Sequence, residues 1–137
     1  MSVRMVLRSS DSKSLHTNNK PWDFSIRLPR LLPLTIEWTV ELTEISISRV
    51  IQDTFQNEIY IYCSICDESI VGEKVLPLLR RVYISNTGNT IFLKPYRIPI
   101  RFTDLTDIHI YIKDRKDKDA SFLFGELTLT LLFRPGK

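Results

Sequence analysis

Glycine and cysteine are scarce in this 137-residue sequence, which contains 4 glycines and 2 cysteines. So few glycines leave little room for a phosphate-binding loop, and two cysteines are fewer than a secreted disulfide scaffold normally carries. No apolar run approaches the roughly 20 residues that cross a bilayer as a helix. No Asn-x-Ser/Thr sequon occurs, and the amino-terminal segment lacks the apolar core of a signal peptide. These absences predict a protein made inside the cell, with no membrane span.

Charge of one sign is also lacking. The 19 basic and 16 acidic residues give a net charge of +3, a balance that does not indicate a nucleic-acid partner. The densest charged segment, KDRKDKD at residues 113–119, mixes both signs, whereas a nucleic-acid-binding patch has one. We therefore expect a solvated loop there and no direct nucleic-acid contact. The length suits a single domain spanning residues 1–137, large enough to bury a core without disulfides.

Apolar and polar residues alternate along most of the chain, with the two-residue period of half-buried strands. Strands joined by turn-forming segments, with no long helical segments between them, predict an all-β sandwich or barrel. In one strand Ile45 follows Leu42 at odd spacing, which predicts a β-bulge. The strands are expected near residues 2–9, 23–29, 36–48, 58–66, 80–85, 90–94, 107–113 and 125–133.

The last predicted strand carries strongly apolar alternation almost to the end of the sequence. A Greek-key sandwich explains this, because its last strand often lies beside the first, in the middle of a sheet. The inward positions of the strongest strands are expected to share one core. They are Trp38, Val40, Leu42, Ile61, Ile110, Leu129 and Leu131.

Two connecting segments carry weaker signals. Residues 67–80 have room for one or two helical turns, although Gly72 and Pro77 limit them. Residues 85–90, with the sequence SNTGNT, separate two strand patterns and predict a hairpin loop.

No arrangement of residues predicts catalysis or metal binding. Cys63 and Cys66 form a Cys-x-x-Cys pair at the end of a predicted strand, where positions three apart face opposite sides. A reactive thiolate would favour a helix N-terminus, and zinc would need two more ligands, whereas His16 and His109 lie in unrelated segments. We expect structural cysteines, a solvent-facing or interface His109, no cofactor or metal, and no enzymatic activity.

Tyrosines gather on the predicted outer faces of the strands. They alternate with isoleucine and valine positions that are expected to face inward. Tyrosine is enriched at protein interfaces, which predicts a subunit interface; the alternative is that residues of high β-propensity simply cover a solvated sheet. The residues concerned are Tyr60, Tyr62, Tyr83 and Tyr111.

Three blocks, in order and covering nearly the whole chain, resemble one protein family. They are KPWDFSIRLPRLLPLTIEWTVELTEISIS, IYIYCSICDESIVGEKVLPLLRRVYI, and LKPYRIPIRFTDLTDIHIYIKD with the later FLFGELTLTLLFRP. The first resembles that family's F-x-x-x-L-P and W-x-V-x-L-x-E-I strands, the second its YCD…VG…PLLR region, and the third its closing strands. The family comprises the minor capsid, or penton, proteins of Polinton (Maverick) elements, adintoviruses and virophages.

The resemblance implies a single jelly-roll β-sandwich of two four-stranded antiparallel sheets. It further implies a structural virion protein, assembled as a homopentamer at the fivefold vertices of an icosahedral capsid, beside a double jelly-roll major capsid protein. One departure is clear: the family often places a short Asp- and Gly-containing turn where this chain has the glycine-free KDRKDKD. The geometry of that loop is therefore left open.

Two other functional classes compete with the capsid protein. One is a lectin-like or cytokine-like jelly-roll binding module, for which a signal peptide would be expected. Another is a pentameric histone chaperone resembling nucleoplasmin, which would carry an acidic tract that is missing here.

Overall fold

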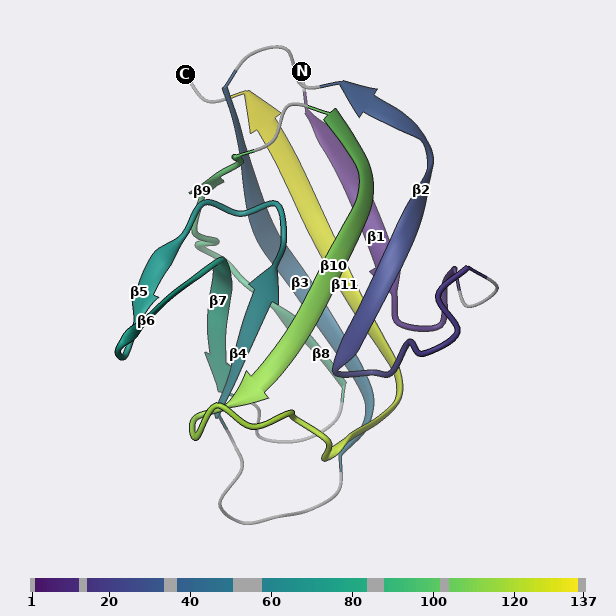
Figure 1. The fold of residues 1–137 in the computed structure, drawn as a ribbon, viewed down its shortest axis with the longest axis vertical. Coiled ribbons are helices and arrows are strands. Elements are labelled where there is room, and N and C mark those ends of the chain that lie inside the picture. The colour runs from purple at the N-terminus through teal and green to yellow at the C-terminus, as the bar shows by residue number, and fades with distance from the viewer. Residues whose placement is uncertain are drawn as a thin grey trace.

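Two antiparallel sheets lie face to face in the computed structural model (Figure 1). The structure describes residues 2–12, 15–33, 37–50, 58–83, 88–101 and 104–135. Within them every regular element is a strand. The strands are β1 (Val3–Arg8), β2 (Asp23–Pro33), β3 (Trp38–Val50), β4 (Glu58–Cys63), β5 (Ser69–Val71), β6 (Lys74–Leu76), β7 (Leu78–Tyr83), β8 (Gly88–Ile91), β9 (Ile98–Pro99), β10 (Asp104–Asp114) and β11 (Leu123–Pro135).

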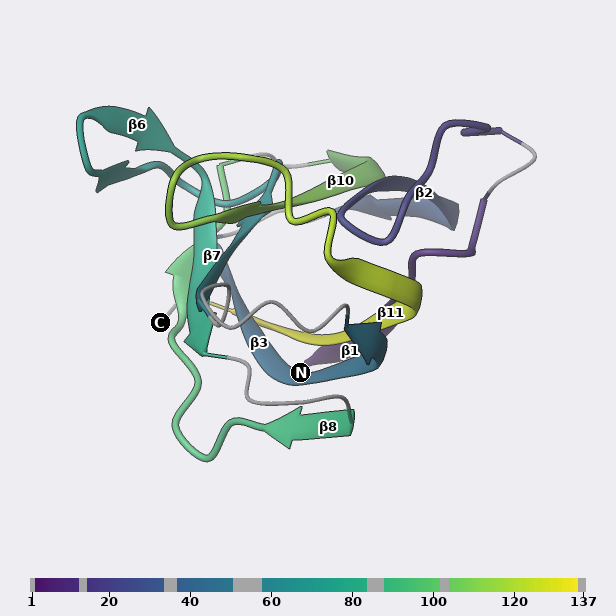
Figure 2. The same ribbon diagram turned by 90° about the horizontal axis from the view of Figure 1, so that it is seen from below.

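The strand order is that of a single jelly-roll. The first sheet has the order β1-β11-β3-β8, with the short β9 also paired to β3, and the second has the order β2-β10-β4-β7. Successive main strands mostly alternate between the two sheets, which lie as two layers in Figure 2; β4 and β7, which flank the β5–β6 hairpin, are neighbours in the second sheet. The predicted all-β jelly-roll of two four-strand sheets is confirmed.

The last strand lies inside the first sheet. Leu129 of β11 is opposite Leu7 of β1 on one side and opposite Ile45 of β3 on the other. All three side chains are buried. The apolar character of β11 therefore follows from its central position, as the sequence predicted.

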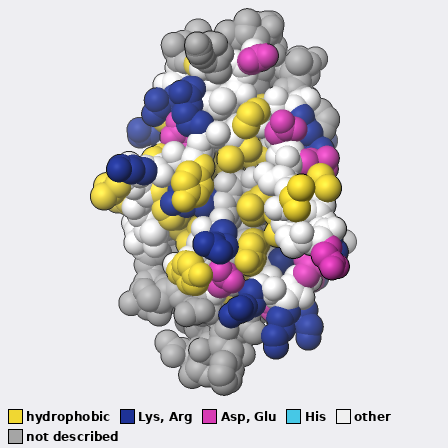
Figure 3. Space-filling view, turned by 90° about the vertical axis from the view of Figure 1, so that its left-hand side faces the viewer, with side chains coloured by type: hydrophobic (Ala, Val, Ile, Leu, Met, Phe, Trp, Pro, Cys, Tyr) yellow, Lys and Arg dark blue, Asp and Glu magenta, His cyan; other side chains and the backbone are white. Residues whose placement is uncertain are grey.

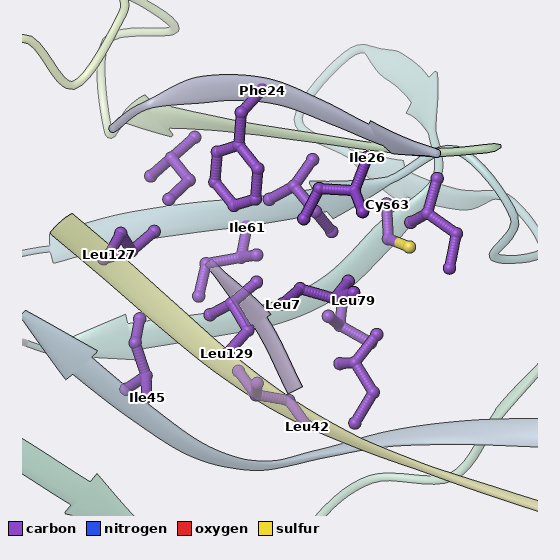
Figure 4. Packing of buried hydrophobic residues seen from close by; sticks show 14 of the residues in the cluster. Leu7, Phe24, Ile26, Leu42, Ile45, Ile61, Cys63, Leu79, Leu127 and Leu129 are labelled. Carbon is purple, nitrogen blue, oxygen red and sulfur yellow. The ribbon is translucent and has the colours of Figure 1, made fainter. Parts of the chain in front are cut away.

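The core fills the space between the two sheets (Figure 4). Both layers contribute aliphatic side chains whose burial stabilises the fold by roughly 1.5–3 kcal/mol each. Six of the seven predicted core residues belong to this cluster, whereas Trp38 is only partly buried and packs against its edge. The six are Val40, Leu42, Ile61, Ile110, Leu129 and Leu131.

A bulge in β3 accounts for its odd apolar spacing. Glu44 is opposite Thr130 and Leu42 is opposite Leu131, so Thr43 is an extra residue in the β3–β11 ladder. The Thr43 hydroxyl donates a hydrogen bond to the Thr130 carbonyl at 3.1 Å. Because of the extra residue, both Leu42 and Ile45 point into the core, and the predicted bulge is confirmed.

The helical turns predicted within residues 67–80 are wrong. The segment instead forms the β5–β6 hairpin, whose turn places Gly72 at a φ of 63°. Glycine adopts this left-handed conformation without the strain that a Cβ imposes. The hairpin projects from the β4–β7 side of the sandwich (Figure 2).

The hairpin predicted at residues 85–90 is also wrong. β7 pairs with β4 in the second sheet and β8 pairs with β3 in the first. β7 and β8 therefore belong to different sheets and do not pair with each other, and residues 84–87 lie outside the described part of the chain. No helix among the described residues is long and apolar enough to cross a membrane.

Candidate interaction surfaces

The four tyrosines singled out from the sequence all lie on the outer face of the second sheet, because their strand neighbours point into the core. Tyr62 of β4 is directly opposite Tyr111 of β10, and their rings stack with centroids 5.0 Å apart. The His109 ring lies 5.1 Å from Tyr111, and its Nε2 lies 2.7 Å from a carboxylate oxygen of Asp23. His109 faces the solvent side, as predicted, with a side chain that is 42% exposed.

Tyr62 departs from the sequence-based prediction, because it points outward but is only 2% exposed. The β5–β6 hairpin folds over it, and Val71 and Leu76 of the hairpin face the sheet across a cleft of about 340 Å³. Burial raises the pKa of Tyr62 to about 12. Alternation along β4 predicted the direction of this side chain but not the cover supplied by an inserted hairpin.

The remaining tyrosines differ in exposure. Tyr60 is partly buried and donates a hydrogen bond of 3.4 Å to Glu58. Tyr83, at the end of β7, is 63% exposed, and the Arg81 guanidinium lies 5.5 Å from its ring centre. Arg81 also pairs with Glu58 at 3.6 Å. Of the four tyrosines, Tyr83 is thus the one that offers an open aromatic face to a partner.

The charged loop after β10 is organised by one buried carboxylate. Asp114 is 6% exposed, and its Oδ1 accepts hydrogen bonds from the backbone N–H groups of Lys116 and Lys118 at 2.8 and 3.0 Å. Asp117 adopts a φ of 64°, a conformation that Asp tolerates better than most residues. Asp117 also forms an ion pair with Lys74 of the β5–β6 hairpin. The turn therefore forms without glycine and helps to hold the hairpin in place.

The two cysteines face the same core, contrary to the expectation that they face opposite sides. A turn follows Cys63, closed by a 3.0 Å bond from the Cys66 N–H to the Cys63 carbonyl, and it returns Cys66 to the interior. Both thiols are free and buried. A hydrogen bond with the Cys63 side chain, together with burial, raises the pKa of Cys66. Within the described residues, no group of three or more His, Cys, Asp or Glu side chains is placed to hold a metal ion.

A second surface, missed from the sequence, lies along the edge formed by β7 and the segment from β8 to β9. The Arg80 guanidinium is held between two rings, 4.0 Å from the centre of Phe92 and 4.3 Å from that of Tyr96. Figure 3 shows hydrophobic side chains gathered on this side of the molecule, with Lys and Arg among them. We call the exposed members the edge patch: Tyr83, Ile91, Leu93 and Tyr96.

The sequence signal for this surface was present but ambiguous. The alternation at residues 90–94 predicted a strand, and a half-buried strand would hide part of its apolar side chains. In the structure β8 pairs with β3 alone and ends at Ile91. Leu93 lies beyond the end of the strand and is 93% exposed.

The strand order and the two-layer packing define a single jelly-roll protein. A scan against protein-family models finds no family that matches this chain. A search of the curated proteins likewise finds no match.

Proposed function

We propose that this chain is a structural virion protein, a homopentameric penton at the fivefold vertices of an icosahedral capsid. Its partners are further copies of itself and a double jelly-roll major capsid protein, and it acts through its surfaces without catalysis. The resemblance of its three sequence blocks to penton proteins supports the role and supplies the number five. The jelly-roll fold is consistent with it.

The edge patch is the observation that carries the proposal. Tyr83, Ile91, Leu93 and Tyr96 are each more than 60% exposed, and they lie along one side of the sandwich with the ring-stacked Arg80 among them. Aromatic residues and arginine are enriched at the centres of protein interfaces. A cyclic ring buries two different patches of every subunit against its neighbours, and the edge patch supplies one of these.

This proposal includes only part of the tyrosine interface that was expected from the sequence. Tyr83 belongs to the edge patch, and Tyr60 and Tyr111 are partly exposed on the outer face of the second sheet. Tyr62 is buried within the subunit and is no longer proposed as a contact residue.

Two measurements test the proposal. Light scattering of the purified protein is expected to give an assembly of about 80 kDa, five times the 16.1 kDa chain. Particles assembled from this chain and a double jelly-roll capsid protein are expected to show five copies of the chain at each vertex in a cryo-electron microscopy map. Vertices that form without the chain would contradict the capsid role directly.

A binding module is the second candidate, favoured by the cleft under the β5–β6 hairpin. Its volume of about 340 Å³ lies at the lower end of the range for ligand pockets. Tyr60 lines it together with charged side chains, including Glu73 and Asp117. A glycan array on the purified protein tests this function: a specific glycan whose binding is lost on Glu73→Ala favours a lectin-like module, and an empty array counts against it.

A further inference from the structure

The β5–β6 hairpin presents an apolar pair to solvent. Ile70 and Val75 are cross-strand partners that are 81% and 60% exposed, whereas Val71 and Leu76 on the other face line the cleft over the sheet. A two-stranded hairpin alone is marginally stable in water. Burial of this exposed aliphatic pair against another surface would therefore stabilise the hairpin.

A groove on the other side of the molecule matches this pair in character. It lies between β1 and β2, which are the edge strands of the two sheets, and has a volume of about 430 Å³. Met5 and Leu7 from β1 and Ile26 and Leu28 from β2 are among its lining residues. Val6, also in the lining, is 47% exposed. Arg4, Asp11, Ser12 and Arg27 also line the groove, so it combines apolar and charged side chains. Its volume is large enough to take two aliphatic side chains.

The positions and charges of the two features favour a contact between copies. The hairpin and the β1–β2 edge lie on opposite sides of the sandwich in both ribbon views (Figures 1 and 2). Glu73 is exposed in the hairpin turn and Arg4 is exposed beside the groove. Within the described part of the chain neither side chain has an ion pair, so they are complementary charges left for a neighbour.

We propose that the outer face of the β5–β6 hairpin of one copy seats in the β1–β2 groove of the next, with Ile70 and Val75 in the groove. The two surfaces differ, so the contact is head-to-tail, and repetition closes a ring when the rotation between copies permits. The inference rests on the proposed homopentamer and names its repeating contact. It places the edge patch, on the same side as the hairpin, at the same boundary.

Mixed disulfide formation tests the contact. Val75→Cys and Val6→Cys are made in separate chains, mixed and oxidised, and a linked dimer is expected in the mixture but in neither variant alone. Val75→Cys mixed with Ser121→Cys is the matched control, because Ser121 is exposed but lies in the loop before β11. Linkage in the control to the same extent would mean random collision and would overturn the contact.

A charge-insertion variant supplies an independent measurement. Ile70→Glu with Val75→Glu is expected to weaken self-association at least about tenfold. Both side chains are exposed, so the variant keeps its β-rich circular dichroism spectrum. A parent pentamer that neither forms the mixed disulfide nor responds to the charges overturns this contact and leaves the capsid proposal standing. A parent that stays monomeric overturns the contact as well, and vertex occupancy then decides the capsid role alone. If the mixed disulfide forms in the pentamer but the chain is missing from the capsid vertices, the contact is supported and the capsid role is refuted.

Discussion

Tyr62 and Tyr111 stack across neighbouring strands, with ring centroids 5.0 Å apart and planes inclined by 21°. They meet because they are directly opposite in the β4–β10 pair, where side chains on one face are in contact. The β5–β6 hairpin then covers Tyr62. Tyr62 is therefore enclosed within one subunit, and a substitution of Tyr62 changes folding before it changes assembly.

A charged substitution is expected to affect stability very differently at the buried Tyr62 and at the exposed Tyr83. Tyr62→Glu is expected to cost at least about 3 kcal/mol in unfolding free energy, because it removes a packed ring and buries a carboxylate. Tyr83→Glu, at a position 63% exposed, is expected to stay within about 0.5 kcal/mol. Urea unfolding measures both, and equal losses would contradict the assigned burial.

Alkaline pH is expected to destabilise the protein through Tyr62. Its folded pKa is about 12, above the ordinary value of 10.0, so the folded state holds this proton more tightly than the unfolded state. The resulting stability is fully present below pH 10 and is lost as pH rises from about 10 to 12. Tyr62→Phe removes this titration, so its stability should fall less over that interval. The slope of unfolding free energy against pH measures it, and an unchanged slope would contradict the assignment.

Core truncation tests the register of the central strand. Leu129 is 0% exposed in the middle of the first sheet, so Leu129→Ala is expected to cost about 2–5 kcal/mol. Thr128→Ala, one residue earlier on the outer face, is the matched control and is expected to cost far less. Similar losses for the two substitutions would show that the face assignment of β11 is wrong.

Gly72 and Gly125 both have a positive φ. Comparing alanine substitutions at the two positions therefore separates backbone strain from steric crowding. Gly72 has a φ of 63° with no atom within 4 Å of an added Cβ, whereas a Cβ at Gly125 (φ 74°) would lie 3.0 Å from the Ser48 Cβ. Gly72→Ala should therefore cost about 1–2 kcal/mol from strain alone. Gly125→Ala should cost at least about 1 kcal/mol more, because crowding adds to strain. Chemical denaturation of the two variants provides the comparison.

The sheets could be predicted from the sequence because the burial of one face of each strand produces the alternation of apolar and polar residues. Each main strand has one face in the core, so the period of two appears directly in residues such as Ile108, Ile110 and Ile112, all fully buried. The shift between Leu42 and Ile45 was also readable, because a bulge restores the inward phase. The hairpin at residues 69–76 was not, because its short strands pack mostly outside the core and leave only Gly72 as a turn signal.

The surfaces were predicted less well because exposure depends on neighbours far away in sequence. Tyr62 and Tyr83 both point outward from adjacent strands, but they lie at opposite ends of the β4–β7 pair, and only Tyr62 lies next to the hairpin. Arg80 gave no signal as an interface residue, because its stacking depends on Phe92 and Tyr96 from a later segment. Such pairings are set by the connections between strands, which alternation does not encode.

The central place of β11 has a consequence for how the protein is made. A ribosome releases β1 and β3 long before β11, yet both must wait for β11 before their facing backbone groups can pair. Until then the nascent chain exposes two unpaired strand edges, the kind of surface that recruits other chains. Completion of the sheet is therefore a late, long-range event, of the type that makes β-rich proteins fold slowly. We expect the yield of native protein during synthesis to depend on how well those two edges are shielded from neighbouring polypeptides.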